Sequence, residues 1–469
     1  MEEVRLCRAC GHIDPVDSRG RCPTCGLFFD LAIVPRAEAE LIARQRRRTV
    51  LRRRLARLTV ACALIGSAII WALGAYWDLG PSPPGATTSV SVSIGPHTWG
   101  QIGRTPHNSG FTPDAAPFPR HVAWTYRTSK PLLASPAVVD LHVYLTTGDG
   151  RTIALDRHTG QLVWEYHSGW LSSSTPAVAG EAVIFAIRPG RVISLDRQTG
   201  TRRWDVDLRS PIVASPVVAN GTVYLGAADK QLYALDAATG RQRWAFATQD
   251  WIVSAVAYAD DRVIVSSQDS RIHVVGAETG RRRLVYETGI GRHVGAAPAV
   301  EGDRAYFVSV GGRVWAIDWH ATTYPLERGI LFWQTNLFLW GMLSTPPVQK
   351  GSVWSRRVGG EVRQTPALAH GLVYVTTSQG KVVALEAALG TERWRADVGV
   401  EITAAPTVAG ASVLIGTESG GVFGLNAHTG EALWVFKTGG KITGRPVVAG
   451  ETMYVVSHDG ALYAITGSE

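Results

Sequence analysis

The stretch "ALDAATGRQRW", Ala234–Trp244, recurs in closely related forms along this chain of 469 residues. Forty residues upstream the sequence reads "SLDRQTGTRRW", and forty residues before that it reads "ALDRHTGQLVW". Self-similarity with a fixed period of about 20–50 residues indicates a repeat architecture. The first question for this sequence is therefore how many repeats it holds.

The residue that closes each repeat, nearly always tryptophan, gives the count. The spacing is 40 residues except between Leu284 and Trp354, where it is 70, so one repeat carries an insertion. The eight closing positions are Trp124, Trp164, Trp204, Trp244, Leu284, Trp354, Trp394 and Trp434. Each repeat holds four short runs of alternating polarity, rich in Val, Tyr and Trp and divided by Gly or Asp turns, which is typical of strands. Four strands in one such repeat predict the blade of a β-propeller.

The repeated turn has a structural explanation. The Asp236 carboxylate and the Thr239 hydroxyl can accept hydrogen bonds from backbone N–H groups nearby, and Gly240 can supply a positive φ. Trp244 is expected to pack against the neighbouring blade, with its indole N–H reaching a backbone carbonyl. Because these residue types recur from blade to blade, they indicate a fold and not a single site.

The ends of the repeat array predict how the ring closes. The last repeat, "TGRPVVAGETMYVVSHDGALYAITGSE", stops after its third strand, whereas "RHVAWTYRT", Arg120–Thr128, precedes the first repeat without partners. We expect this N-terminal strand to complete the last blade, which removes exposed strand edges. The predicted fold over residues 98–469 is an all-β, eight-bladed propeller, with an insertion at 319–353 in blade 5.

The motif "ALDxxTGxxxW" resembles the tryptophan-docking repeat of pyrroloquinoline-quinone-like propellers. That superfamily includes quinoprotein alcohol dehydrogenases and the propeller lipoprotein of the outer-membrane barrel assembly machinery. The lead-in "WGQIGRTPHNSGFTP", Trp99–Pro113, resembles the one that precedes many non-enzymatic members. The resemblance is weaker in blade 4, where Gly276 and Leu284 replace Asp and Trp, and in blade 6, which has "ALEAALG".

The first 62 residues contain all five cysteines. Four of them form two CxxCG motifs, a pattern that suits a structural zinc site in a small ribbon over residues 1–35. The expected ligands are Cys7, Cys10, Cys22 and Cys25. Disulfides are the alternative, which a cytosolic location would disfavour.

A basic segment and an apolar segment follow the ribbon. Eight arginines lie between Arg44 and Arg57, in an expected juxtamembrane helix over 36–57, and the next twenty residues, 58–77, hold no charge. Twenty helical residues span about 30 Å, the thickness of a bilayer core. The arginines predict a cytoplasmic N-terminus and an extracytoplasmic propeller, anchored by one pass through the plasma (inner) membrane with lipid contact through residues 58–77. The Pro/Ser/Thr-rich residues 78–97 are expected to be an extended, poorly ordered linker.

Charge is distributed unevenly between these parts. Residues 1–57 hold 13 arginines and 7 acidic residues, an excess of 6 out of the net charge of +8 for the whole chain. The propeller is therefore nearly neutral, and the basic segment borders an apolar span, so we expect no nucleic-acid partner.

Candidate ligand-binding residues lie in the loops that precede each inner strand and are expected to converge at the mouth of the central channel. They are Trp170, Trp251, Arg292, His293, Glu361, Arg363, Glu401, Lys441 and Arg445. These residues can bind a small polar ligand or a peptide end; the alternative is a solvated ring of loop charges.

The insertion is the most individual feature of the propeller. Residues 330–343 are mostly apolar but are too few to span a bilayer. Three interpretations stay open, a flap over the propeller, a partner-docking surface and an interfacial membrane anchor. Its candidate contact residues are Phe332, Trp333, Phe338 and Trp340.

The sequence predicts a non-catalytic scaffold that binds protein or ligand, and the resemblance implies a role in cell-envelope protein assembly. A quinone-dependent oxidoreductase is the rival. The resemblance implies that such an enzyme would need a vicinal disulfide over the cofactor, and no cysteine follows Cys62. Pyrroloquinoline quinone is therefore not expected. A third hypothesis is a sensor that signals ligand occupancy to the ribbon.

Overall fold

The computed structural model describes residues 3–7, 12–13, 21–22, 31–76, 83–289, 293–323 and 327–467, with the backbone alone for residues 3, 31, 46, 47, 50, 54, 69–76 and 328. The chain divides into two units, Met1–Gly80 and Pro81–Glu469. In the first unit, β1 (Glu3–Cys7) pairs antiparallel with β2 (Leu31–Pro35), and α1 (Arg36–Tyr76) follows directly. Buried Val4, Leu6, Ala39 and Ala43 pack the hairpin against the start of this helix.

One continuous helix, α1, runs through the expected basic segment and all but the last residue of the expected apolar segment. Where side chains are described in the apolar part they are exposed, as Leu58 at 60% and Leu64 at 67%. Within the described residues, no helix is long and apolar enough to cross a membrane. The predicted span 58–77 lies only partly within those residues, since side chains from 69 onward are not among them.

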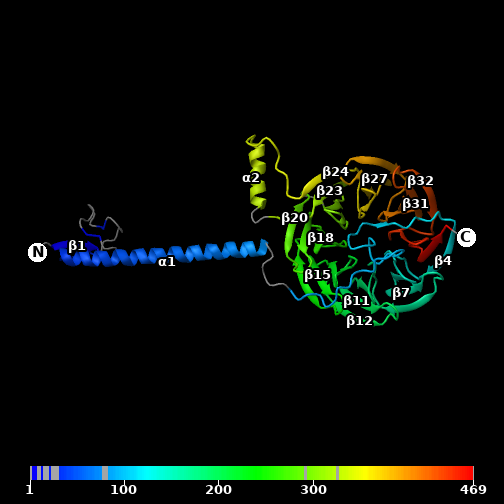
Figure 1. Cartoon of the computed structure of the whole chain (residues 1–469), viewed down its shortest axis with the longest axis horizontal. Helices are drawn as coiled ribbons and strands as arrows, with labels where there is room; N and C mark the ends of the chain where they lie inside the picture. The colour runs from blue at the N-terminus through cyan, green and yellow to red at the C-terminus, as the bar shows by residue number, and fades with distance from the viewer. Residues whose placement is uncertain are drawn as a thin grey trace. The chain divides into compact units, whose positions relative to one another are not determined.

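In the described part of the second unit, eight antiparallel sheets form a ring of blades (Figure 1). Within each blade the strands run in sequence order from the innermost to the outermost, apart from the last blade. Blades 1 to 4 comprise β5 (Ala137–Val139), β6 (His142–Thr146), β7 (Arg151–Asp156), β8 (Leu162–His167); β9 (Ala177–Ala179), β10 (Ala182–Ile187), β11 (Arg191–Asp196), β12 (Arg202–Asp207); β13 (Val217–Ala219), β14 (Thr222–Gly226), β15 (Gln231–Asp236), β16 (Gln242–Ala247); and β17 (Ala257–Ala259), β18 (Arg262–Ser267), β19 (Arg271–Gly276), β20 (Arg282–Glu287). Blades 5 to 8 comprise β21 (Ala299–Glu301), β22 (Arg304–Val308), β23 (Arg313–Asp318), β24 (Ser352–Arg357); β25 (Ala367–Ala369), β26 (Leu372–Thr376), β27 (Lys381–Glu386), β28 (Glu392–Asp397); β29 (Thr407–Ala409), β30 (Ser412–Gly416), β31 (Gly421–Asn426), β32 (Ala432–Lys437); and β33 (Val447–Ala449), β34 (Thr452–Val456), β35 (Ala461–Thr466) with β4 (His121–Arg127).

The predicted closure of the ring is confirmed. Strand β4 pairs antiparallel with β35, so a strand from the start of the propeller completes the blade at its end. The register joins Trp124 to Ala464 and Arg127 to Ala461. As a result the last blade has the same four-stranded form as its neighbours.

The repeated turn is built as the sequence predicts. The Asp236 carboxylate accepts hydrogen bonds from the backbone N–H of Thr239 at 2.9 Å and from its hydroxyl at 2.8 Å. Gly240 has φ +73°, and a Cβ at this position would come within 2.8 Å of the Trp204 ring of the preceding blade. This glycine therefore provides both the turn conformation and the room in which the neighbouring tryptophan docks.

At six of the closing positions the tryptophan also donates its indole N–H to a backbone carbonyl of the next blade, as expected. Trp204 donates to the Ala237 carbonyl at 2.9 Å and Trp244 to the Ala277 carbonyl at 2.8 Å. The further pairs are Trp124 with Arg157, Trp164 with Arg197, Trp354 with Ala387 and Trp394 with Ala427. These side chains link neighbouring blades around the ring through apolar packing and one hydrogen bond each.

Between blades 4 and 5, a different tryptophan fills the gap that Leu284 leaves. Trp319 follows the third strand of blade 5, is 1% exposed, and belongs to the same buried cluster as Leu284. Its indole N–H donates to the Gly302 carbonyl at 3.0 Å, and the Arg262 guanidinium lies 5.6 Å from its ring centroid. The departure from the repeat in blade 4 is therefore compensated from blade 5.

The lead-in, Trp99–Pro113, runs along the inner strands from blade 1 to blade 7 and crosses the middle of the ring in Figure 1. Its backbone carbonyls and the Gln101 side chain accept hydrogen bonds from the inward-facing N–H groups of successive blades, because the innermost strand of a blade has no further strand to pair with. In sequence order the acceptor–donor pairs are Trp99–Val138, Gly100–Val178, Gln101–Val218, Pro106–Tyr258, His107–Val300, Ser109–Leu368 and Gly110–Val408. Strand β3 (Phe111–Thr112) then pairs parallel with β29, and the Asp114 carboxylate accepts from Gly450 N–H in blade 8.

The described part of the expected linker is attached to the propeller. Thr87 N–H donates to the Asp236 carboxylate at 2.7 Å, and Ser93 N–H donates to the Val178 carbonyl at 2.9 Å. This differs from the expectation of an extended, poorly ordered segment over 78–97. The reason is that turn and inner-strand groups of blades 2 and 3 are available to pair with this segment.

Candidate functional site

The central channel holds a cavity of about 220 Å³. Its wall is made by the residues that lead into the inner strands, and Ile102 of the lead-in also lines it. In the segment that leads into blade 3, for example, the exposed fraction of the residue is 44% at Val213 and 6% at Ser215. The lining residues are Ile102, Leu133, Ala134, Ser135, Ser173, Thr175, Val213, Ala214, Ser215, Val253, Ser254, Ala255, Gly295, Ala296, Ala297, Arg363, Gln364, Thr365, Ala405, Thr443, Gly444 and Arg445.

One position in this wall differs sharply among the blades. In each blade a proline, or Val256 in blade 4, leads into the inner strand. The residue directly before it is small in seven blades and is an arginine in blade 8. In blade order these residues are Ser135, Thr175, Ser215, Ala255, Ala297, Thr365, Ala405 and Arg445. The channel therefore receives a long cationic side chain from one blade alone at this level.

Arg445 is 4% exposed, and its guanidinium lies against Gly110 of the lead-in. A Cβ at position 110 would overlap the guanidinium, so glycine is what leaves space for it. The buried Nη1 has no hydrogen-bond partner among the described residues. Burial lowers the pKa of Arg445 to about 10. The side chain still carries a positive charge at neutral pH.

The other predicted mouth residues lie on the rim, and several have protein partners. Trp170 is 57% exposed and Trp251 is 49% exposed. His293 Nδ1 lies 2.9 Å from the Gln268 carbonyl, and Arg363 forms an ion pair with Glu361 at 2.8 Å. Arg292 lies outside the described residues. The rim therefore combines exposed aromatic rings with charged groups that are partly paired, and both sequence interpretations of it stay open.

Three of the predicted residues meet in a second, smaller recess. This recess has a volume of about 140 Å³ and lies beside the channel, which it meets at Arg363, Gln364 and Thr443. Glu401 and Lys441 line it as well. The Lys441 ammonium is paired with Glu418 at 2.5 Å, so that this cation is already compensated.

His458 lies beside the same rim and was not predicted. Its Nε2 is 2.9 Å from the Thr443 hydroxyl, and burial together with the Lys441 charge lowers its pKa. It follows the second strand of blade 8, and nothing in the repeat pattern distinguishes that turn from the others.

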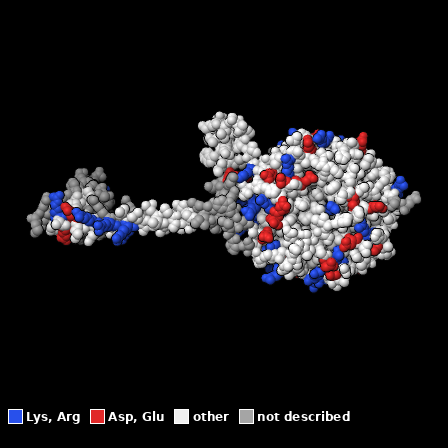
Figure 2. Space-filling view, in the orientation of Figure 1, with Lys and Arg blue, Asp and Glu red and all other residues white. Residues whose placement is uncertain are grey.

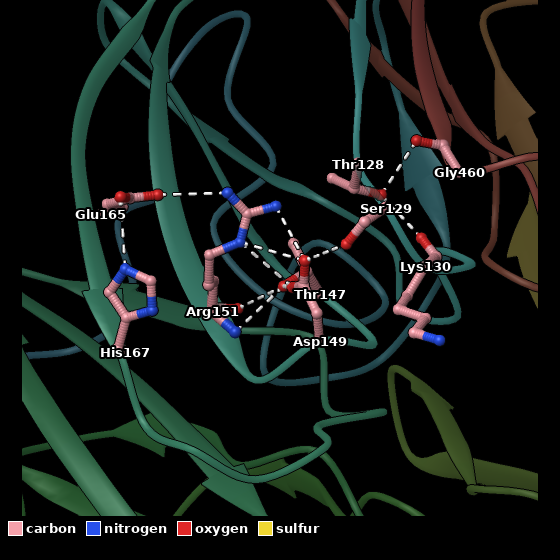
Figure 3. A network of polar contacts seen from close by, with 9 residues as sticks. All are labelled: Thr128, Ser129, Lys130, Thr147, Asp149, Arg151, Glu165, His167 and Gly460. Atoms are coloured by element: carbon pink, nitrogen blue, oxygen red, sulfur yellow. Dashed lines mark hydrogen bonds and ion pairs between the residues drawn. The ribbon is translucent and has the colours of Figure 1, made fainter.

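Figure 3 shows the polar network at the seam where the ring closes. The Arg151 guanidinium bonds the Asp149 carboxylate, with an Nη2–Oδ2 distance of 2.8 Å, and the Ser129 hydroxyl donates to the same carboxylate at 2.8 Å. Thr128, directly after β4, donates to the Gly460 carbonyl of blade 8 at 2.9 Å. The network therefore ties the closing strand to blades 1 and 8, which is a structural role.

The insertion in blade 5 contains helix α2 (Glu327–Leu339). Phe332 is 62% exposed, Trp333 60% and Trp340 61%, while Phe338 is half-buried. Three aromatic rings with this exposure do not fit a flap whose apolar side chains cover the propeller.

The predicted zinc ligands are described only in part. Cys7, which ends β1, and Cys22 are both buried. Cys10 and Cys25 lie outside the described residues. Within the described ranges, no group of three or more His, Cys, Asp or Glu side chains is placed to hold a metal ion.

A family model described as "Outer membrane protein assembly factor BamB" matches residues 119–211, 168–251, 247–324 and 327–469. These matches together cover most of the chain and nearly all of the propeller. A comparison with curated proteins gave no match.

Solved structures of propellers are similar to this one. BamB from Moraxella catarrhalis has a TM-score of 0.60 and 19% identity, over 74% of this chain and 97% of that chain. A quinohemoprotein alcohol dehydrogenase from Comamonas testosteroni has a TM-score of 0.64 and 15% identity, over 79% of this chain and 81% of that chain. A europium-containing methanol dehydrogenase has a TM-score of 0.62 and 15% identity, over 76% of this chain and 89% of that chain. At these identities the structures are similar in fold, and they include both an assembly factor and oxidoreductases.

Proposed function

We propose, because the chain belongs to the family of outer membrane protein assembly factor BamB, that its propeller is a non-catalytic scaffold for protein partners in cell-envelope assembly. The observation that carries this proposal is the exposed apolar surface of helix α2 and the residues that follow it. Contiguous exposed apolar residues on a folded protein commonly mark a surface for a partner.

The composition of this surface favours a protein partner. Residues 329–343 contain no charged residue, and the helix is white over its visible face in Figure 2. The exposed side chains include Trp333, Trp340 and, at 70%, Met342. Tryptophan and methionine are enriched at the cores of protein interfaces, and charged residues are depleted there.

The test is site-specific photo-crosslinking in intact cells with the full chain. A photoreactive residue at Trp340 should give a crosslinked protein band, and one at Leu433, which is 46% exposed on an outer strand, should not. Replacing Trp333 and Trp340 with Ser should leave the melting temperature nearly unchanged, since neither ring is buried, and should weaken the crosslink from a neighbouring position such as Leu339. A large fall in melting temperature would show that α2 is part of the propeller core and would contradict the proposal.

We propose further that α1 anchors the propeller in the plasma membrane with the N-terminus in the cytoplasm. The uncharged segment 58–77 and the eight arginines before it support this orientation. Protease added to spheroplasts should digest the propeller and spare the first 35 residues. Digestion of those residues with the propeller protected would reverse the orientation.

A structural zinc ion held by Cys7, Cys10, Cys22 and Cys25 remains part of the proposal. The burial of Cys7 and Cys22 is consistent with a site closed to solvent. Metal analysis of the full chain should find one zinc per molecule, and Cys22→Ser should remove it.

Catalysis with a bound quinone is not part of the proposal. Among the described residues, none that lines the channel cavity is Asp, Glu, Cys or aromatic. A flat quinone with a calcium ion would need carboxylate ligands and planar contacts, so the residues present do not fit it. We expect no dye-linked alcohol oxidation after reconstitution with pyrroloquinoline quinone and calcium; turnover would overturn the scaffold proposal.

A further inference from the structure

The channel contains a buried positive charge that the protein itself does not compensate. Within the described residues, Arg445 forms no ion pair, and its Nη1 is buried without an acceptor. Burying an arginine without a counter-charge is strongly unfavourable, and native proteins pair nearly all such groups. An arginine in this position is therefore expected to pair with an anion from outside the chain.

The local structure is shaped around this side chain. Gly110 has φ +64° and lies where any Cβ would overlap the guanidinium. The carbonyl of Gly110 is held by Val408 N–H of blade 7 at 2.9 Å. This bond fixes the backbone of Gly110, against which the guanidinium lies.

Hydroxyl donors face the same cavity. Ser215 Oγ accepts the Thr175 backbone N–H at 3.0 Å, and Thr365 Oγ1 accepts the Ala297 backbone N–H at 3.2 Å. Neither hydroxyl donates to an acceptor within the described part of the chain, so each proton is available to a ligand. The wall supplies donors and two arginines, of which Arg363 is paired with Glu361 and Arg445 has no ion pair among the described residues. None of the described residues that line the cavity is a carboxylate.

The size and lining of the cavity narrow the class of anion. About 220 Å³ is far more than the roughly 10–15 Å³ that one water molecule needs, and less than the 300–1,000 Å³ of pockets for drug-sized ligands. Polar groups make up most of the cavity surface, and its apolar part comes from side chains such as Ala214, Ala255, Ala296, Ala405 and Ile102. One buried cation without a counter-charge suits a small monoanion, whereas a phosphate dianion would keep an uncompensated charge.

We propose that the central channel binds a small organic acid through its carboxylate, with Arg445 as the pairing cation and the hydroxyls of the channel wall as donors. A planar guanidinium matches a carboxylate through two parallel hydrogen bonds. The site is separate from helix α2, and failure of either proposal leaves the other standing.

The test measures binding to the full chain by calorimetry and by thermal shift. Acetate, butyrate and hexanoate are the probes, with chloride, sulfate and phosphate at matched ionic strength as reference anions. The carboxylates should raise the melting temperature in a saturable way. A short peptide and its C-terminal amide show whether a chain-terminal carboxylate also enters the channel.

Variants separate binding from a structural role. Arg445→Met should reduce carboxylate affinity at least about ten-fold while leaving the melting temperature in chloride equal to or above that of the wild type, because a buried unpaired charge has been removed. Arg445→Lys should keep the charge but lose much of the affinity, since an ammonium offers no planar pair of donors. Arg282→Gln, on an exposed outer strand, controls for the loss of one positive charge.

Three results would overturn the proposal. They are an unchanged carboxylate response in Arg445→Met, an equal or stronger response of the wild type to phosphate, and no response to any carboxylate at millimolar concentrations. If Arg445→Met fails to fold, Ser215→Ala and Arg445→Lys carry the same test, and undiminished binding in both would equally exclude the site.

Discussion

Two rings of residues in the propeller differ in how uniformly they repeat from blade to blade. The outer ring of docked tryptophans is nearly uniform, and each indole N–H shown above is paired with a carbonyl of the next blade. The inner ring of residues around the channel is uniform in seven blades and broken in the eighth by Arg445. Uniform positions hold the ring together, whereas Arg445, the exception in the inner ring, is the residue on which the proposed ligand site rests.

The closing strand should give the largest effect of any change in the outer ring. Deleting residues 121–127 removes β4, so that β35 becomes an exposed edge and Trp124 no longer docks on blade 1. We expect loss of cooperative thermal unfolding, followed by calorimetry or near-ultraviolet circular dichroism. An unchanged melting curve would show that the ring does not depend on its closure.

Replacing a docked tryptophan should have the next largest effect on stability. Trp204→Ala leaves a large cavity between blades 2 and 3 and should lower the free energy of unfolding by about 3–5 kcal/mol. Trp319→Ala should cost a similar amount, because Trp319 fills the corresponding gap beside Leu284. Chemical denaturation measures both. If Trp319→Ala lowered the free energy of unfolding by less than about 1 kcal/mol, the interpretation that Trp319 fills the gap between blades 4 and 5 would be wrong.

The difference between the rings also explains what sequence alone could predict. The blades, their count and the closure by β4 follow from a strict period, because strand and turn patterns are local. The path of the lead-in has no period, since its partners, such as Val138 and Leu368, lie far apart along the chain. The sequence identifies Arg445 as a mouth residue but does not predict its burial, because that burial depends on Gly110, which lies more than 300 residues earlier in the chain.

Trp319 could have been identified from the sequence. It follows Asp318 directly, at a position where blade 3 has Ala237 and blade 1 has Arg157. A tryptophan added in the blade after the one that lacks it is a signal of compensation. Arg292, Cys10 and Cys25 lie outside the described residues and stay predictions.

Two glycines separate backbone strain from tryptophan docking. Gly240 and Gly399 have nearly the same φ, +73° and +74°, but a Cβ would meet Trp204 at the first and nothing within 4 Å at the second. Gly399→Ala should therefore cost only the strain of a left-handed alanine, about 1–2 kcal/mol. Gly240→Ala should cost more, because the ring of Trp204 must also move. If chemical denaturation gave the same loss of unfolding free energy for both variants, the ring of Trp204 would not be tightly packed against this turn.

The smallest effect concerns the charge network at the seam of the ring. Burial alone would raise the pKa of Asp149, but hydrogen bonds from Arg151, Thr147 and Ser129 outweigh it and hold that pKa well below its ordinary value. A carboxylate with a depressed pKa in the folded state stabilises the protein above its unfolded pKa of about 3.8. That contribution is lost progressively as pH falls below this value through the folded pKa.

Asp149→Asn removes the charge and should lower the melting temperature by a few degrees or less at pH 7, since the pair lies near the surface. The difference between wild type and variant should be constant from pH 7 to about pH 5. It should shrink below about pH 4, where the carboxylate takes up a proton in the unfolded chain but stays ionised in the folded protein. Ser129→Ala, which removes one neutral donor to the same carboxylate, serves as the matched control and should change this pH dependence less. A difference that stays constant down to pH 2 would mean that Asp149 acts at the seam through hydrogen-bond geometry and not through its charge.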